Sequence, residues 1–157
     1  MSYSPAIVAN AVLTRANQRG IFISHLKLQK LVFFTHAWCL AILGEPAVNE
    51  RPEAWEFGPV FNTLYYRLKE RGHERIREYI ESVDATTNAF ATLVPSPADD
   101  RFWRILDQVM DRYGTFTAAQ LSTLSHEPGG PWEQARLAGQ AVIPDETVRL
   151  FYEGKLQ

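Results

Sequence analysis

The sequence predicts a mainly helical α+β fold, a single-domain helical bundle around one central apolar helix. Residues 25–44 are apolar nearly all round, which is typical of a helix in the middle of a bundle. Short runs near residues 55 and 90 have strand composition and predict a small antiparallel β-sheet or hairpin. The chain has 157 residues, 46% of them hydrophobic, which suffices for one buried core. Residues 1–157 are therefore expected to form one domain.

Two helices are predicted before residue 45. Ser4 and Pro5 are a typical helix start, with serine as the N-cap and proline in the first turn, and Gly20 closes this helix. Ser24 caps the second helix, which runs to Gly44. Apolar side chains cover nearly its whole circumference: Leu26, Leu28, Leu31, Val32, Phe33, Phe34, Ala37, Trp38, Leu40, Ala41 and Ile42.

The middle of the chain predicts strands and a third helix. Trp55 and Phe57 alternate with a polar residue in a strand-like run. Gly58 and Pro59 are expected to open the third helix, with Pro59 in its first turn and Gly72 beyond its end. Residues 74–97 are ambiguous between helix and strand, and we interpret them as a β-hairpin that the Trp55 run joins in a small sheet.

The last third of the chain returns to helices. Residues 97–113 predict an amphipathic helix, and Thr117 with Gln120 has the spacing of a capping box that opens a short one. Further helices are predicted from Pro131 and from Pro144 or Asp145.

The charge is distributed unevenly along the chain. The formal net charge is −2, yet the first 44 residues contain four basic residues and no acidic one: Arg15, Arg19, Lys27 and Lys30. This region either docks onto the acidic remainder of its own fold or offers a positive surface to an acidic partner or nucleic acid. Four charges are far fewer than a nucleic-acid-binding stripe contains, so internal docking is favoured and nucleic-acid binding is not expected.

The positive charges of Lys27 and Lys30 are expected to need an acidic partner. They fall in the first two turns of the central helix, where the helix macrodipole disfavours cations. The acidic partner is either within the fold, with Glu53 or Glu56 as candidates, or on another protein. Internal pairing is favoured because the following strand carries those acids.

The residues provide no strong catalytic or cofactor signal. The single cysteine, Cys39, lies in the most apolar helix, where a cysteine is usually an unreactive packing group. His25 and His36 are three helical turns apart, roughly 16 Å, and cannot share one metal ion. No phosphate-binding glycine motif occurs. We therefore expect a binding protein, not an enzyme, and no cofactor.

No targeting or membrane-spanning segment is expected. The first ten residues lack the basic start and apolar run of a signal peptide. The most apolar uncharged stretch, residues 31–43, is shorter than the roughly 20 residues that span a bilayer. A cytoplasmic protein without membrane contact is the expectation.

Aromatic residues gather around the predicted loops and helix starts. Most of these side chains are expected in the core, whereas one or two exposed members would be natural anchors for a protein partner. The set comprises Trp55, Phe57, Tyr65, Tyr66 and Trp132.

Several short motifs occur in a characteristic order. They are the run Leu26–Leu31 with the sequence LKLQKL, the pair Ala37 and Trp38, the run Ala54–Val60 with the sequence AWEFGPV, and His126 followed by Pro131 and Trp132. Together they resemble the Panacea domain family, also described as SocA-like or GepA-type phage-associated proteins, over roughly residues 4–138.

The resemblance implies an antitoxin of a two-gene toxin–antitoxin system. Such a protein would bind its cognate toxin, encoded by the adjacent gene, and block it by direct protein–protein contact. The toxin's own class does not follow from the resemblance. The family motif supplies the candidate partner-binding residues Lys27, Gln29, Lys30, Trp55, Phe57, Gly58, Pro59, Tyr65, Tyr66, His126 and Trp132.

Three alternatives stay open. The shared motifs are equally suited to fold-defining roles, in which case partner choice would reside in variable surface such as residues 74–97. A nucleic-acid-binding regulator associated with a mobile element would use the basic residues between 67 and 77, although interleaved glutamates suggest i,i+4 pairs on a solvated face. A small enzyme would use His126 or Cys39.

Overall fold

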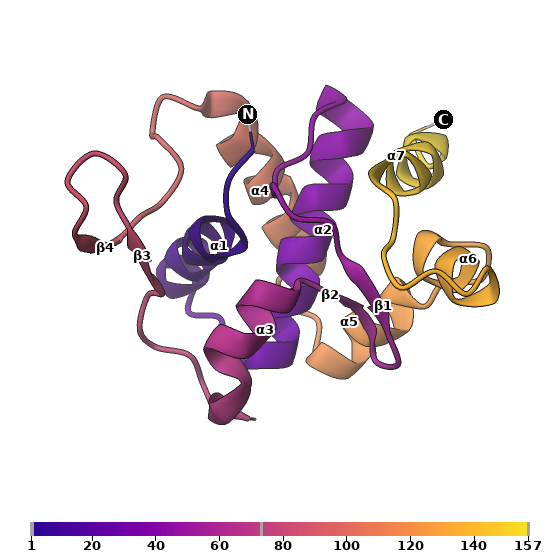
Figure 1. Ribbon diagram of the computed structural model, residues 1–157, viewed down its shortest axis with the longest axis horizontal. Coiled ribbons are helices and arrows are strands. Elements are labelled where there is room, and N and C mark those ends of the chain that lie inside the picture. The colour runs from indigo at the N-terminus through magenta and orange to yellow at the C-terminus, as the bar shows by residue number, and fades with distance from the viewer. Residues whose placement is uncertain (1, 73, 157) are drawn as a thin grey trace.

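A computed structural model describes residues 2–72 and 74–156, and within them it confirms the mainly helical α+β fold (Figure 1). The long helix α2 runs through the middle, and α1, α3, α4, α5 and α7 pack around it, whereas α6 packs against α7 and β1. The elements in chain order are α1 (Pro5–Arg19), α2 (His25–Leu43), β1 (Glu53–Trp55), β2 (Gly58–Val60), α3 (Asn62–Leu68), the 3₁₀ turn η1 (Lys69–Arg71), β3 (Glu81–Val83), β4 (Phe90–Thr92), α4 (Asp100–Tyr113), α5 (Ala118–Ser125), α6 (Pro131–Leu137) and α7 (Asp145–Gly154).

Helix α2 forms the centre of the core, as predicted. The Ser24 side chain accepts a hydrogen bond from the Lys27 backbone, and Gly44 closes the helix in the left-handed conformation. In the described residues it is the one helix with the length and apolar composition of a membrane span, and 83% of that stretch is buried inside the fold. The apolar circumference therefore serves packing against the surrounding helices.

Helix α1 docks onto α4 through charges. Arg15 Nε lies 2.6 Å from a carboxylate oxygen of Asp107, and Arg19 Nη1 lies 2.6 Å from one of Asp111. The predicted internal docking of the basic N-terminal region is thus confirmed for both arginines.

The first β-hairpin differs from the prediction in its register. Strand β1 ends at Trp55, so Phe57 lies in the turn, and Gly58 and Pro59 belong to strand β2 instead of opening a helix. Gly58 has φ +112°, a backbone angle that other residues rarely adopt, and it allows the chain to fold back antiparallel at this point. Helix α3 begins only at Asn62.

The outer edge of β1 is paired with a distant segment. Ala54 N–H donates to the Ala141 carbonyl at 2.8 Å, and Ile143 N–H donates to that of Pro52 at 2.8 Å. Strand β1 is therefore paired on both of its edges, with β2 on one and with residues 141–143 on the other.

The second hairpin, β3–β4, lies in the predicted segment 74–97 but forms a sheet of its own. The expectation that the Trp55 run joins it was wrong. Asn10 of α1 binds this hairpin instead, because its buried side chain hydrogen-bonds the Ile80 backbone N–H and C=O, each at 2.8 Å, and the Leu93 carbonyl at 2.9 Å. These contacts place the hairpin beside α1, apart from β1–β2 (Figure 1).

The basic segment does not form the predicted paired helix face. Helix α3 ends at Leu68, a single 3₁₀ turn ends at Arg71, and residues 74–80 are not helical. The i,i+4 spacing of arginines and glutamates therefore aligns no pairs there. One of these arginines, Arg67, donates instead to the backbone carbonyl of Glu81.

The C-terminal third contains the predicted helices. Asp99 caps α4, which begins at Asp100 and not at residue 97. Thr117 and Gln120 form the predicted capping box of α5, with both reciprocal hydrogen bonds present. Pro131 occupies the first turn of α6, and α7 begins at Asp145.

Candidate functional site

Most of the family-motif residues meet at the β1–β2 hairpin. Side chains from α6 hold the carbonyls of its first strand. Arg136 Nη1 donates to the Ala54 carbonyl at 3.1 Å, and Trp132 Nε1 donates to the Trp55 carbonyl at 2.7 Å. Both donors come from more than 75 residues further along the chain, so the contact depends on the tertiary fold.

The turn of the hairpin is held in the same way from α2 and α5. Lys30 Nζ donates to the Phe57 carbonyl at 2.7 Å, and Ser122 Oγ donates to the same oxygen at 3.3 Å. The Nε2 atom of His126 lies 3.4 Å from the Glu56 carbonyl. Four consecutive carbonyls, those of residues 54–57, therefore each face a side-chain hydrogen-bonding group, which fixes the backbone of the turn.

Lys30 and Gly58 are packed against each other. The Lys30 side chain is completely buried, and burial lowers its pKa to about 7. A Cβ atom placed on Gly58 would lie 2.2 Å from Lys30 Nζ and 2.9 Å from Ser125 Oγ. Glycine is thus required here for two reasons: the backbone has a positive φ, and the Lys30 ammonium group occupies the space that a Cβ atom would need.

Replacing Lys30 is expected to change how stability depends on pH. The pKa of Lys30 is about 7 in the folded chain, against about 10.4 for an unperturbed lysine. Between these values the unfolded chain binds the extra proton, so the free energy of unfolding rises with pH, by up to about 1.4 kcal/mol per pH unit. Urea unfolding at pH 7 to 9.5 should show a steeper rise in the wild type than in Lys30→Met.

The informative quantity is the difference between the two proteins at each pH. Burial also lowers the pKa of Lys27, but both proteins retain that residue and its contribution cancels. A difference that stays constant across the range would contradict a Lys30 pKa near 7.

The two lysines are compensated by carbonyl oxygens, not by the predicted carboxylates. Lys27 Nζ donates to the Gly114 carbonyl at 2.7 Å, and Lys30 donates to that of Phe57. Glu53 accepts instead from the Trp55 indole at 2.8 Å. Internal compensation was correct, whereas Glu53 and Glu56 as the compensating groups were wrong.

Gln29 joins the hairpin to the central helix. Its side-chain amide accepts from the Phe61 backbone N–H at 3.0 Å and donates to the Phe61 carbonyl at 3.1 Å. This reciprocal pair holds the chain just after β2. Pro59 and Val60, within that strand, are buried. Gln29 and Lys30 therefore bind the two ends of the same strand from adjacent positions on α2.

The aromatic residues divide into packed and exposed members. Trp55 and Tyr65 contact each other at 4.7 Å between ring centroids, and Trp132 packs on the His126 ring at 4.0 Å. Phe57, at the hairpin turn, is 68% exposed. Tyr66, at 57% exposed, is the second aromatic residue of the set that faces solvent.

The structure thus brings most of the predicted residues together and separates one of them. Lys27 points to the loop after α4, away from the hairpin. Sequence reasoning missed Ser122, Ser125 and Arg136, which also contact the hairpin or its lysine. Isolated serines and an arginine on amphipathic helices carry no sequence signal for such a role.

Cys39 and His126, the two residues that the enzyme hypothesis named, are both engaged in the fold. Cys39 is buried, and burial raises the pKa of its thiol to about 12, which disfavours the nucleophilic thiolate. The His126 ring nitrogens face backbone carbonyls. In residues 2–72 and 74–156, no three or more His, Cys, Asp or Glu side chains are grouped to hold a metal ion. The surface feature that results is the exposed Phe57 on a fixed turn.

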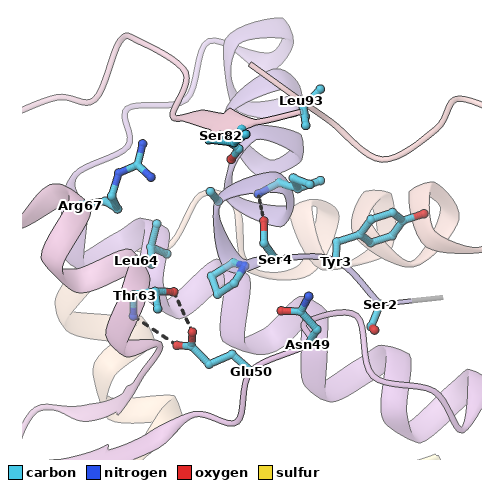
Figure 2. A pocket seen from close by; sticks show the side chains of 14 residues that line it. Ser2, Tyr3, Ser4, Asn49, Glu50, Thr63, Leu64, Arg67, Ser82 and Leu93 are labelled. Carbon is cyan, nitrogen blue, oxygen red and sulfur yellow. Dashed lines mark hydrogen bonds between the residues drawn. The ribbon is translucent and has the colours of Figure 1, made fainter. Parts of the chain in front are cut away.

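A separate pocket of about 620 Å³ lies between the N-terminal segment, α3 and β3 (Figure 2). Its charged groups have partners within the chain. The Glu50 carboxylate accepts from the Thr63 hydroxyl at 2.7 Å, and Arg67 donates to the Glu81 carbonyl. None of the predicted motif residues lines this pocket.

Sequence comparisons assign the chain to a family. The sequence model described as "Antitoxin SocA-like, Panacea domain" matches residues 28–133, a range that contains β1, β2 and α5, nearly all of α2 and the first three residues of α6. The chain therefore belongs to the SocA-like Panacea domain family, as the sequence motifs predicted.

A curated relative is the protein named "Antitoxin SocA" from Caulobacter vibrioides (strain NA1000 / CB15N). It is 36% identical over 126 residues, which are 80% of this chain and 66% of the relative. The match thus spans slightly less than two thirds of the relative's length. No solved structure matches the chain significantly.

Proposed function

We propose that this protein is an antitoxin that neutralises a cognate toxin by direct protein–protein binding, in the cytoplasm and without catalysis. Membership of the family and the 36% identity to a protein named an antitoxin support the antitoxin role. The observation that carries the binding proposal is the β1–β2 hairpin, which presents an exposed Phe57 on a backbone held by Lys30, Ser122 and side chains of α6.

A rigid aromatic anchor is well suited to an interface. Aromatic residues are enriched among the few side chains that dominate binding energy. Ordering a flexible loop on binding costs affinity, and a turn whose carbonyls are already hydrogen-bonded avoids most of that cost. Phe57 is therefore the residue we assign to the toxin contact, with Tyr66 as a second exposed aromatic side chain.

Co-expression with the product of the adjacent gene tests the function. That product should stop growth when it is expressed alone, and growth should return when both proteins are present. The two should also form a complex on gel filtration, with an interface of at least about 1,000 Å² in total. Failure of rescue, or rescue without any complex, would refute neutralisation by direct binding.

A further inference from the structure

The outer edge of strand β4 has no neighbouring strand. Figure 1 shows the β3–β4 hairpin at the periphery of the molecule, with α1 between it and α2. Asp84 N–H donates to the Ala89 carbonyl at 2.8 Å, which fixes how the backbone groups alternate along the two strands. Those of Ala91 face β3, whereas those of Phe90 and Thr92 face away from it. In the part of the chain that the structure describes, these outward-facing groups have no hydrogen-bond partner.

The other sides of the hairpin are covered within the chain. On β3, the Glu81 carbonyl accepts a hydrogen bond from Arg67 of α3. At the base of the hairpin, the Asn10 side chain hydrogen-bonds the backbone of Ile80 and of Leu93. The outer edge of β4 is therefore the side on which a further strand can be added.

This edge lacks the features that normally keep strands from pairing. Native proteins protect an exposed edge with charged side chains, proline, bulges or a covering segment. Residues 89–94 have the sequence AFATLV, with no charged residue and no proline. On the outer face of the hairpin, the side chains of Phe90, Val83 and Val94 are 74, 54 and 43% exposed. An uncharged, exposed strand of this kind is a template for another strand.

We propose that β4 pairs antiparallel with β4 of a second copy of this chain, which joins the two hairpins into one four-stranded sheet. The edge is complementary to itself. When Phe90 lies opposite Thr92 of the second copy, their outward-facing groups exchange hydrogen bonds, about four in the pair of chains. The two-fold axis then passes Ala91 and the interface is closed. This inference goes beyond the antitoxin function and does not depend on it.

The side chains fit this register. At the axis, the two Ala91 residues lie opposite each other with their Cα atoms about 4.5 Å apart, a close approach that the small side chain allows. The two Phe90 rings lie diagonally across the pair, within reach of each other. Since residues 89–94 carry no charge, pairing brings no like charges together along the two strands. Helix α1 packs on β3, the strand further from the axis, which leaves room for the second copy.

The edge is short, so the dimer is weak. Strands of three residues bury much less than the about 1,000 Å² of a stable interface. We therefore expect a dimer that depends on concentration, with a dissociation constant of roughly 0.1 mM.

Sedimentation equilibrium of the purified full chain, from about 5 µM to about 1 mM, tests the proposal. Thr92→Pro removes an outward-facing N–H and should weaken the dimer at least tenfold, because proline at such an edge position breaks no hydrogen bond within the chain. Val83→Pro is the matched control. It makes the same change on β3, where the N–H faces away from β4, and should stay within twofold of the wild type. Phe90→Lys places two like charges diagonally across the pair and should also weaken the dimer at least tenfold.

Amide hydrogen exchange locates the interface in the wild type. The amides of Phe90 and Thr92 should be protected at the highest concentration and exchange quickly at the lowest. The Ala91 amide should be equally protected at both, because it faces β3 within each chain.

Three results would overturn the proposal. The first is a chain that stays monomeric up to about 1 mM. The second is a dimer that Thr92→Pro and Phe90→Lys leave as strong as in the wild type, since another surface would then hold it. The third is loss of binding to the product of the adjacent gene in both variants, at concentrations where the wild type is monomeric, because a toxin strand would then occupy the edge. The antitoxin function stands in all three cases.

Discussion

Replacement of Gly58 by alanine is expected to lower the free energy of unfolding by about 3 kcal/mol. Part of the loss is backbone strain, about 1–3 kcal/mol, because alanine must adopt φ +112°. The remainder comes from the new Cβ atom, which would lie 2.2 Å from Lys30 Nζ. The lysine must move away and lose its hydrogen bond to Phe57, which is typically worth about 1 kcal/mol. Urea unfolding at pH 7 measures the sum.

Gly139→Ala separates the two contributions. Gly139 also has a positive φ, +68°, but nothing lies within 4 Å of the Cβ position, so only the strain of about 1–2 kcal/mol applies. In a Lys30→Ala background, Gly58→Ala should likewise cost less than in the wild type, because the clashing ammonium group is gone. If Gly58→Ala lowers the free energy of unfolding equally in both backgrounds, contact with Lys30 is not the reason that position 58 requires glycine.

Phe57→Ala is expected to weaken binding to the product of the adjacent gene about 30-fold or more, which corresponds to about 2 kcal/mol for a dominant interface residue. The free energy of unfolding should change little, because the Phe57 side chain is mostly exposed and the contacts of the turn are made by its backbone carbonyl. Calorimetric titration gives the affinity, and urea unfolding of the same samples verifies the fold.

Phe90→Ala is the matched control. Phe90 is 74% exposed on β4, in the other hairpin and outside the family motif. Its replacement should change the affinity less than twofold. The opposite pattern, with Phe90→Ala harmful and Phe57→Ala harmless, would place the toxin contact on the β3–β4 hairpin. The family motif would then have a purely structural role.

The helices could be predicted because their signals are local. Ser4, Ser24 and Thr117 cap the helices that follow them, through hydrogen bonds that span three residues. The apolar spacing within each helix likewise involves neighbours in the sequence. Such features act before any tertiary contact forms, and the observed bounds agree with them to within a few residues.

The hairpin could not be placed correctly in the same way. Gly58 and Pro59 are compatible with both a helix start and a hairpin strand, and the local pattern favoured the helix. The decision depends on donors that lie 27 to 82 residues away in the sequence, from Lys30 to Arg136. The hydrogen-bond partners of Lys27 and Lys30 could not be predicted for the same reason. Every residue has a backbone carbonyl, and the sequence does not show which one a buried ammonium group will reach.

The sequence by itself determined the fold class, the central helix, the helix caps and the family, since these depend on local spacing and on ordered motifs. Only the tertiary structure decided that Lys30, Ser122, His126 and Trp132 act together on the carbonyls of one turn, and that Phe57 is exposed on it. The physical reason is that burial and hydrogen bonding are satisfied between segments far apart in the chain, and which segments meet depends on packing of the whole core.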